Sequence, residues 1–329
     1  MKKKLNYRRR RRGVYIPPPI KLLALLLAAA GVFAWVRHDR GPGAEQPAGS
    51  GTEPVQGEPS HDPLPEKITT PAGVACTLTR LGEDAVYTGN LILVNNWTPF
   101  HFPDGQAEAL SCILDERTDS YYVRDSSVLL MPEALQALND MMDAFKAQGS
   151  RKSVQIVAGH RTTEYQQHLF DQSAERNGLE HAKKYVAQPG CSEHHTGLVV
   201  DMGTMDGEFM DSSGDYAWIT ANCQDYGWVV RYETGKEDLT GIWDEPWHFR
   251  YVGVPHATEM VRLDYCLEEY IPYLKKFPLD GEHLIIDCAS GKYEVWYAQG
   301  SETYLPDDRV YTVSGNNVDG VIVTCRIDG

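Results

Sequence analysis

Positive charge is scarce over most of this sequence of 329 residues. Of its 31 Lys and Arg, eleven lie within residues 1–40, whereas only one of its 46 Asp and Glu lies there. The rest of the chain therefore carries 20 basic against 45 acidic side chains. Nucleic-acid binding depends on Lys and Arg that neutralise phosphates. This acidic balance excludes DNA and RNA as expected partners.

The sequence also lacks closely spaced cysteines. Its seven cysteines form no Cys-x-x-Cys pair, which excludes the common structural zinc patterns. Because the number is odd, at least one thiol has no partner within the chain. Cys288 and Cys325 fall in the first and last β-like runs of the C-terminal region, where pairing of the two strands would allow a disulfide. Two buried free thiols are the alternative.

Long apolar runs are absent except for residues 22–36. Fifteen helical residues span only about 22 Å, which is short of the ~30 Å hydrocarbon core of a bilayer. The run is either an uncleaved membrane anchor or a signal peptide with a cleavage region near residues 28–30. We favour the anchor, because apolar residues continue beyond that region.

The basic residues before the apolar run predict its orientation. Positively charged flanks stay on the cytoplasmic side of a membrane. We therefore expect residues 1–40 to be a basic cytoplasmic head and anchor, with the body of a single-pass protein of the cell membrane on the extracytoplasmic side. Residues 41–66, rich in Gly, Pro, Glu and Ser, predict a disordered linker.

The remaining sequence predicts a main part over residues 67–276, with an irregular lead-in, and a small β appendage over residues 277–329. Amphipathic spacing, caps and turn residues define the expected elements of both. Helices are expected at residues 132–149, 163–178 and 216–226, and from Pro255 onward with Met260, Leu263, Leu267 and Tyr270 inward. Strands are expected at residues 90–94, 154–158, 198–202 and 228–232, around His248, and at 283–287, 293–297, 309–313 and 321–326.

Two short segments contain side chains suited to one metal ion. They supply His194, Asp201 and His248 as candidate ligands, with Glu245 three residues before the last histidine. Two histidines and one aspartate suit catalytic zinc, because they leave a fourth position for water. A glutamate beside such a site can take the proton from water as it attacks a carbonyl. The residue types alone do not choose between His194 and His195.

These segments resemble the signature motifs of the VanY-type zinc D-alanyl-D-alanine carboxypeptidases, within a likeness that runs from about residue 87 to 273. The motifs that match are Ser192-x-His194-x-x-Gly197-x-Val199-x-Asp201, Glu245-x-Trp247-His248, and upstream Gly159-His160-Arg161-Thr162 with Gln166. Ala158, His160 and Val199 depart from the family pattern, and the first two could alter the wall of the substrate pocket.

The resemblance implies an α+β fold of the D,D-peptidase/hedgehog type, in which an antiparallel sheet with flanking helices carries a central zinc. It implies one zinc per chain, bound by His194, Asp201 and His248, and Glu245 as general base. It also implies that Arg161 is a catalytic and substrate-binding residue that grips the terminal carboxylate or the developing oxyanion. Gln166 and Ser192 would line the substrate side.

The expected function is therefore removal of the terminal D-Ala from peptidoglycan stem peptides by a monomeric zinc enzyme. One alternative is an L,D-carboxypeptidase that acts on tetrapeptide stems, because these motifs do not fix the stereochemistry of the bond. The other is a wall-binding module without catalysis. Glu245 argues against the second alternative, because a pure binder needs no general base.

Overall fold

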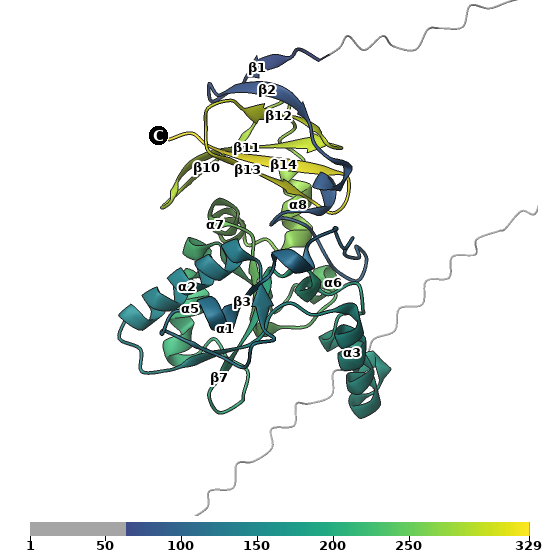
Figure 1. The fold of residues 1–329 in the computed structure, drawn as a ribbon, viewed down its shortest axis with the longest axis vertical. Helices are drawn as coiled ribbons and strands as arrows, with labels where there is room; N and C mark the ends of the chain where they lie inside the picture. Colours follow the sequence, from purple (N-terminus) through teal and green to yellow (C-terminus); the bar gives the residue numbers. More distant parts are fainter. Residues whose placement is uncertain (1–63, 329) are drawn as a thin grey trace, which may run out of the picture. The chain divides into compact units, whose positions relative to one another are not determined.

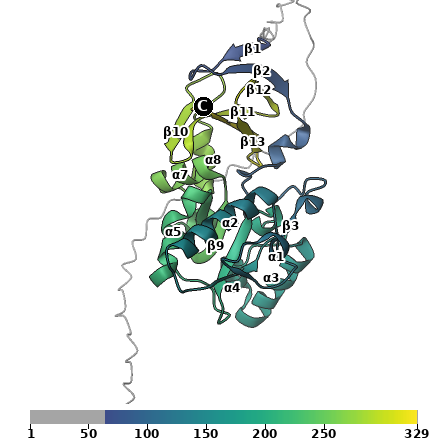
Figure 2. The same ribbon diagram turned by 60° about the vertical axis from the view of Figure 1, so that its left-hand side comes forward.

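A computed structural model describes residues 64–328; the expected head and anchor and most of the expected linker lie outside the described residues. Two groups of strands form the framework, and Figures 1 and 2 show both. No helix within residues 64–328 is long and apolar enough to span a bilayer.

The central sheet has five strands in the order β4-β6-β7-β9-β8. Its neighbours are antiparallel except for β4 and β6, which are parallel. The expected antiparallel sheet is therefore mixed at one edge, because the chain crosses over through helix α2 between β4 and β6. The strands are β4 Tyr122–Val123, β6 Val154–Ala158, β7 Val199–Thr204, β8 Trp228–Tyr232 and β9 Glu245–Tyr251.

Helix α2, Pro132–Ala147, follows the expected amphipathic pattern. Proline occupies its first turn, where no backbone N–H is needed, and its apolar stripe is buried. Leu138 and Phe145 of this stripe share one core cluster with Ile156 of β6 and Val200 of β7. The helix thereby covers the central sheet and fixes the strands that carry the candidate site.

Helix α3, Thr163–Asn177, begins directly after the segment that contains Arg161. The Thr162 side chain accepts a hydrogen bond from the Tyr165 backbone N–H at 3.2 Å, as expected for an N-cap. Gly178, with φ +90°, ends this helix and leads into α4, Leu179–Tyr185. The Thr162 cap thus fixes the start of α3, and Arg161 lies in the short turn between β6 and this cap.

Two expected helices are shorter than the sequence pattern indicates. The first is only α5, Ala217–Asn222, extended by single 3-10 turns on both sides. The second is split into α7, Val254–Leu263, and α8, Leu267–Leu274. The split lies at Asp264, whose φ is +55°, and Glu269 then caps the new helix by accepting from the Cys266 backbone N–H at 3.1 Å. A local capping interaction therefore overrides a continuous apolar stripe.

The C-terminal strands form a four-stranded antiparallel sheet in the order β10-β11-β14-β13. Strand β12, which the sequence did not predict, instead joins β1 and β2 in a second sheet. Residues 67–80, expected as a lead-in to the main part, thus pair with the C-terminal region, as Figure 1 shows. The strands are β1 Lys67–Thr69, β2 Ala75–Arg80, β10 Leu284–Cys288, β11 Gly291–Gln299, β12 Glu302–Pro306, β13 Tyr311–Gly315 and β14 Gly320–Arg326.

The sheet order contradicts a disulfide between Cys288 and Cys325. Strand β11 lies between β10 and β14, so the two cysteines are separated by at least two inter-strand spacings, about 9.6 Å. A disulfide needs Cα atoms within about 7 Å. Cys288 pairs in register with Gly291, Cys325 pairs with Glu294, and both thiols are free.

Residues 90–94 do not form the expected strand. Their side chains alternate between two cores: Ile92 and Val94 pack with the central sheet, whereas Leu91 and Leu93 pack with α8 and the C-terminal sheet. The Leu91 backbone N–H donates to the side-chain hydroxyl of Ser314 in β13 at 2.8 Å, so this contact is not a backbone-to-backbone bond of a sheet. The expected strand is therefore wrong: the apolar side chains of this run are buried between two cores and not within a sheet. The remaining short elements are β3 Ser111–Cys112, paired with β5 Leu129–Leu130, and helices α1 Ile113–Glu116 and α6 Glu237–Thr240.

Candidate active site

The register of two central strands brings two of the candidate ligands together. Asp201 of β7 lies directly opposite His248 of β9 in the antiparallel pair. His194 comes from a 3-10 turn, Glu193–Thr196, just before β7. Gly197, with φ +69°, ends this turn, and a Cβ there would lie 2.4 Å from the Leu110 side chain. Glycine is therefore required for the chain to return into β7.

The three side chains are buried and converge on one point. His194 Nε2 lies 3.3 Å from Asp201 Oδ2, and His248 Nδ1 lies 3.0 Å from Asp201 Oδ1. One donor atom from each residue lies within 4.8 Å of the other two. His194 Nδ1 is 2.7 Å from the Gly159 carbonyl oxygen, which fixes the ring with Nε2 toward the group. This arrangement has the donor types and the separation that a small cation requires.

The protonation states of His194, Asp201 and His248 also suit a bound cation. Burial first, and then the nearby Arg161, lowers the pKa of His194 to about 4, so this imidazole is neutral at pH 7. Burial alone would raise the pKa of Asp201, but His194 and Arg161 hold it well below its usual range. Burial alone would lower the pKa of His248, but the carboxylates around it raise that pKa to about 9. The pocket thus stabilises positive charge at His248, where a metal ion would replace a proton.

Glu245 lies at the start of β9, beside this group. Its Oε2 is 3.5 Å from His248 Nδ1, and its side chain is 12% exposed. Burial, opposed by the nearby His248, raises the pKa of Glu245 to about 7. A general base is most effective when its pKa is near the working pH. At this position and with this pKa, the Glu245 carboxylate could accept a proton from a nucleophile at the ligand group.

Arg161 reaches the group from the turn before α3. Its NH2 donates to Asp201 Oδ2 at 2.5 Å, and its NH1 is 3.5 Å from Gln166 Oε1. The Gln166 amide is itself held by donation to the Ala187 carbonyl at 2.8 Å. The buried Nε of Arg161 has no hydrogen-bond partner among the described residues. The guanidinium is thus fixed at the site with donor capacity left for an anion.

Ser192 and His195 have structural partners. The Ser192 hydroxyl accepts from the His194 backbone N–H at 3.3 Å and so caps the 3-10 turn. His195 Nδ1 is 2.7 Å from the Arg161 carbonyl oxygen, and its Nε2 accepts from the Gly190 backbone N–H at 3.1 Å. Both nitrogens of His195 are therefore engaged away from the ligand group, which leaves His194 as the ligand candidate.

All the predicted site residues line one cavity of about 410 Å³. The cavity continues along α3 and α4 past Arg176 and His181. A neighbouring cavity of about 720 Å³ shares Arg161 and Asp201 with it. Ala158 and His160, which depart from the family pattern, line this second cavity and not the first. Space for an extended ligand thus exists on two sides of Arg161.

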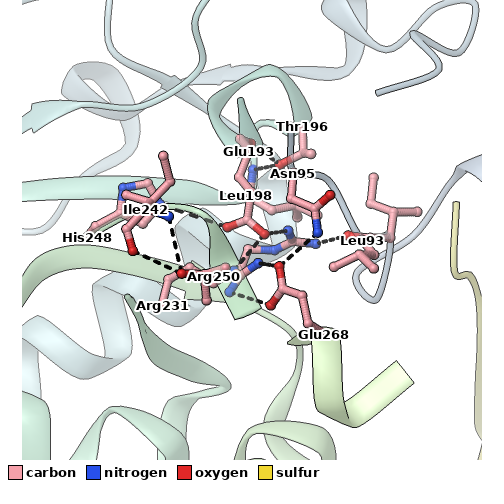
Figure 3. Close-up of polar contacts among 12 residues, drawn as sticks. Leu93, Asn95, Glu193, Thr196, Leu198, Arg231, Ile242, His248, Arg250 and Glu268 are labelled. Atoms are coloured by element: carbon pink, nitrogen blue, oxygen red, sulfur yellow. Dashed lines mark hydrogen bonds and ion pairs between the residues drawn. The ribbon is translucent and has the colours of Figure 1, made fainter. Parts of the chain in front are cut away.

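Glu193 is a buried charged residue of the site that the sequence did not predict. Its Oε1 accepts from Arg231 Nε at 2.8 Å and from Arg250 NH1 at 2.9 Å, and its Oε2 is 3.9 Å from His248 Nε2 (Figure 3). Burial alone would raise the pKa of Glu193, but the two arginines lower it below the usual range. The available signal was an arginine within each of two apolar strands, residues 228–232 and 245–251.

Several known proteins are similar to this chain in sequence. The family described as "VanY: D-alanyl-D-alanine carboxypeptidase" matches residues 127–254. A D-alanyl-D-alanine carboxypeptidase of Enterococcus faecium is 34% identical over 247 residues, which cover 74% of this chain and 77% of that protein. The bifunctional D-Ala-D-Ala dipeptidase and carboxypeptidase VanXYC of Enterococcus gallinarum is 38% identical over 158 residues, which cover 46% of this chain and 81% of that protein.

A solved structure agrees with the sequence comparisons. The crystal structure of the vancomycin-resistance D,D-dipeptidase VanXYg in complex with a D-Ala-D-Ala phosphinate analog matches with a TM-score of 0.68 and 31% identity. The match covers 76% of this chain and 99% of that protein, so it includes more than the motif region. The chain belongs to the VanY family of D-alanyl-D-alanine carboxypeptidases.

Proposed function

We propose that this protein is a zinc-dependent D,D-carboxypeptidase that removes the terminal D-Ala from peptidoglycan stem peptides. Family membership supports the reaction class, and the D-Ala-D-Ala specificity of its relatives supports D-Ala-D-Ala as the bond that is cut. The observation that carries the proposal is the placement of Asp201 opposite His248 with His194 beside them, next to a glutamate whose pKa is about 7. We propose His194 Nε2, one Asp201 oxygen and His248 Nδ1 as the ligands of one zinc per chain.

The proposed catalytic roles of zinc and Glu245 follow from the positions of the side chains. Bound zinc supplies a Lewis acid and lowers the pKa of water to about 7. Glu245 accepts the proton of the attacking water and later delivers it to the leaving amine of D-Ala. With a side chain that is only 12% exposed, it does this largely shielded from bulk solvent. The wall-binding alternative gives no reason to bury a carboxylate there.

We propose that Arg161 binds the negatively charged carboxylate of the substrate. It lines both cavities, and its guanidinium contacts Asp201 at one edge while its Nε has no partner among residues 64–328. A planar guanidinium can grip a carboxylate with two parallel hydrogen bonds. Gln166 orients Arg161 and lines the first cavity. Ser192 lines the same cavity and caps the turn that carries His194.

The remaining parts of the proposal concern the rest of the chain. We propose residues 1–40 as a membrane anchor and 41–66 as a linker, so that a monomeric body acts on the cell wall outside the cytoplasm. Residues 67–276 would contain the peptidase and 277–329 a β appendage, with strand β2 of the first part paired both to β1 and to β12 of the second part.

The products of hydrolysis show whether the enzyme cuts the D,D bond of a pentapeptide stem or the L,D bond of a tetrapeptide stem. We expect the purified protein to shorten a pentapeptide stem ending in D-Ala-D-Ala by one alanine and then to stop, as judged by mass spectrometry. A tetrapeptide stem supplied alone is the matched substrate, and it should remain intact. Shortening of the tetrapeptide to a tripeptide, with the pentapeptide unchanged, would show an L,D-carboxypeptidase instead. The amidated pentapeptide should be a poor substrate if Arg161 reads the terminal carboxylate.

A further inference from the structure

We infer that Glu193 is a positioning residue of the metal site, which accepts a hydrogen bond from His248 Nε2–H and so fixes the ring with Nδ1 toward the metal. This inference rests on the proposed function, because it presumes that His248 binds zinc. Glu193 belongs to neither the ligand set nor the proposed acid–base chemistry, and it acts through His248.

The two ring nitrogens of His248 face different partners. Nδ1 lies 3.0 Å from Asp201 Oδ1 and 3.5 Å from Glu245 Oε2, within the ligand group. Nε2 lies on the other side of the ring, 3.9 Å from Glu193 Oε2. Both His248 Nε2 and Glu193 Oε2 are buried, and neither has a hydrogen-bond partner within residues 64–328. Two orphaned polar atoms of complementary type thus face one another across a short gap.

The other oxygen of Glu193 is firmly held. Arg231 of β8 and Arg250 of β9 both donate to Oε1, at 2.8 Å and 2.9 Å (Figure 3). Arg231 also donates to both carboxylate oxygens of Glu268 in α8, at 3.0 Å and 2.7 Å. Arg250 NH2 donates to the carbonyl oxygens of Asn90 and Ile92. Two arginines, each anchored by a further segment of the chain, therefore fix Oε1 of Glu193 and leave Oε2 facing His248.

Stability alone is a weak explanation for this network. Taking charges out of water is costly, and buried ion pairs are often replaceable by apolar side chains without loss of stability. A function at the metal site explains it better. Histidine ligands usually donate their second N–H to a carboxylate or carbonyl, which fixes the tautomer, orients the ring and raises its basicity. His194 has such a partner in the Gly159 carbonyl, and Glu193 is the corresponding partner for His248.

The proposed hydrogen bond requires His248 Nε2 and Glu193 Oε2 to lie closer together than they do in this structure. The 3.9 Å separation is about 1 Å longer than a normal N–H···O hydrogen bond. The contact must therefore shorten in the zinc-loaded protein, with the His248 proton on Nε2. Nitrogen-15 NMR of the histidine side chains in zinc-loaded wild-type protein shows directly which ring nitrogen of His248 carries the proton. We expect a slowly exchanging, downfield Nε2–H signal for His248; zinc on Nε2 and the proton on Nδ1 would overturn the inference.

A charge-removing variant provides the second test. Glu193→Gln keeps the shape of the side chain but weakens the acceptor, so we expect zinc affinity to fall by about 10- to 100-fold. Competition with a chromophoric chelator measures the dissociation constant, and thermal unfolding checks the fold. The matched control is Glu294→Gln, which alters another buried glutamate with a histidine partner, His283 at 2.9 Å, in the C-terminal sheet. This control should bind zinc as the wild type does.

The outcomes separate the inference from the proposed function. Wild-type protein that binds no zinc would refute the proposed function itself. Wild-type binding with equal affinities in both variants would refute only the role of Glu193. If Glu193→Gln fails to fold, the wild-type NMR experiment still decides the position of the His248 proton.

Discussion

Replacing Glu245 with Gln is expected to remove nearly all peptidase activity while the protein still binds zinc. The amide has the shape of the carboxylate but cannot accept a proton, and general-base catalysis is worth about 10²- to 10⁴-fold. Glu245 contacts His248 only at 3.5 Å and is not one of the three converging donors. We therefore expect kcat to fall by about that factor with one zinc per chain retained, as measured by steady-state kinetics and elemental analysis.

The neighbouring exposed residue Asp244 provides the control for Glu245. Asp244→Asn removes the same charge one position away and should leave kcat and zinc content close to wild type. Loss of zinc together with activity in Glu245→Gln would mean that Glu245 is itself a ligand. Normal activity in that variant would exclude it as the base.

The second large effect is expected from Asp201→Ala, which should lose both zinc and activity. Asp201 is the centre of the ligand group: its two oxygens face His194 and His248, and it also accepts from Arg161. Removal leaves two histidines beside an uncompensated guanidinium, which disfavours a cation. Zinc affinity should therefore fall by more than the roughly 10- to 100-fold that loss of an outer hydrogen-bond partner costs. Chelator competition and a peptidase assay on the same preparation measure both effects.

Asp206, exposed in the turn directly after β7, is the matched control for Asp201. Asp206→Ala should retain zinc and activity, because its side chain lies outside the ligand group. A folded Asp201→Ala protein with full activity would exclude the proposed ligand set, whatever its zinc content.

The grouping of His194, Asp201 and His248 could be predicted from the sequence because these residues occupy short motifs. Asp201 and His248 then meet because antiparallel pairing of two such strands places them opposite one another. Glu193 also lies in a motif, but its partners Arg231 and Arg250 are 38 and 57 residues away. Such an ion network depends on tertiary packing, so periodicity and spacing give no account of it.

The elements of the fold likewise divide into those set by local sequence, which could be predicted, and those set by distant partners, which could not. Helix α2 was predictable because a proline start and a helical apolar stripe are local features. Strand β12 was not, because it pairs with β2, more than 200 residues earlier in the chain. Residues 90–94 were expected to form a strand because they are a short apolar run, but a segment buried between two cores gives the same run.

The central claim is that one zinc at His194, Asp201 and His248 makes this protein a D,D-carboxypeptidase. The most direct test is titration of chelator-stripped protein with zinc while D-Ala release from a pentapeptide stem is followed. We expect no activity in the stripped protein and a rate of D-Ala release that rises linearly with added zinc until one zinc per chain is bound. Full activity in the stripped protein, or no activity at any zinc concentration in folded protein, would contradict this claim.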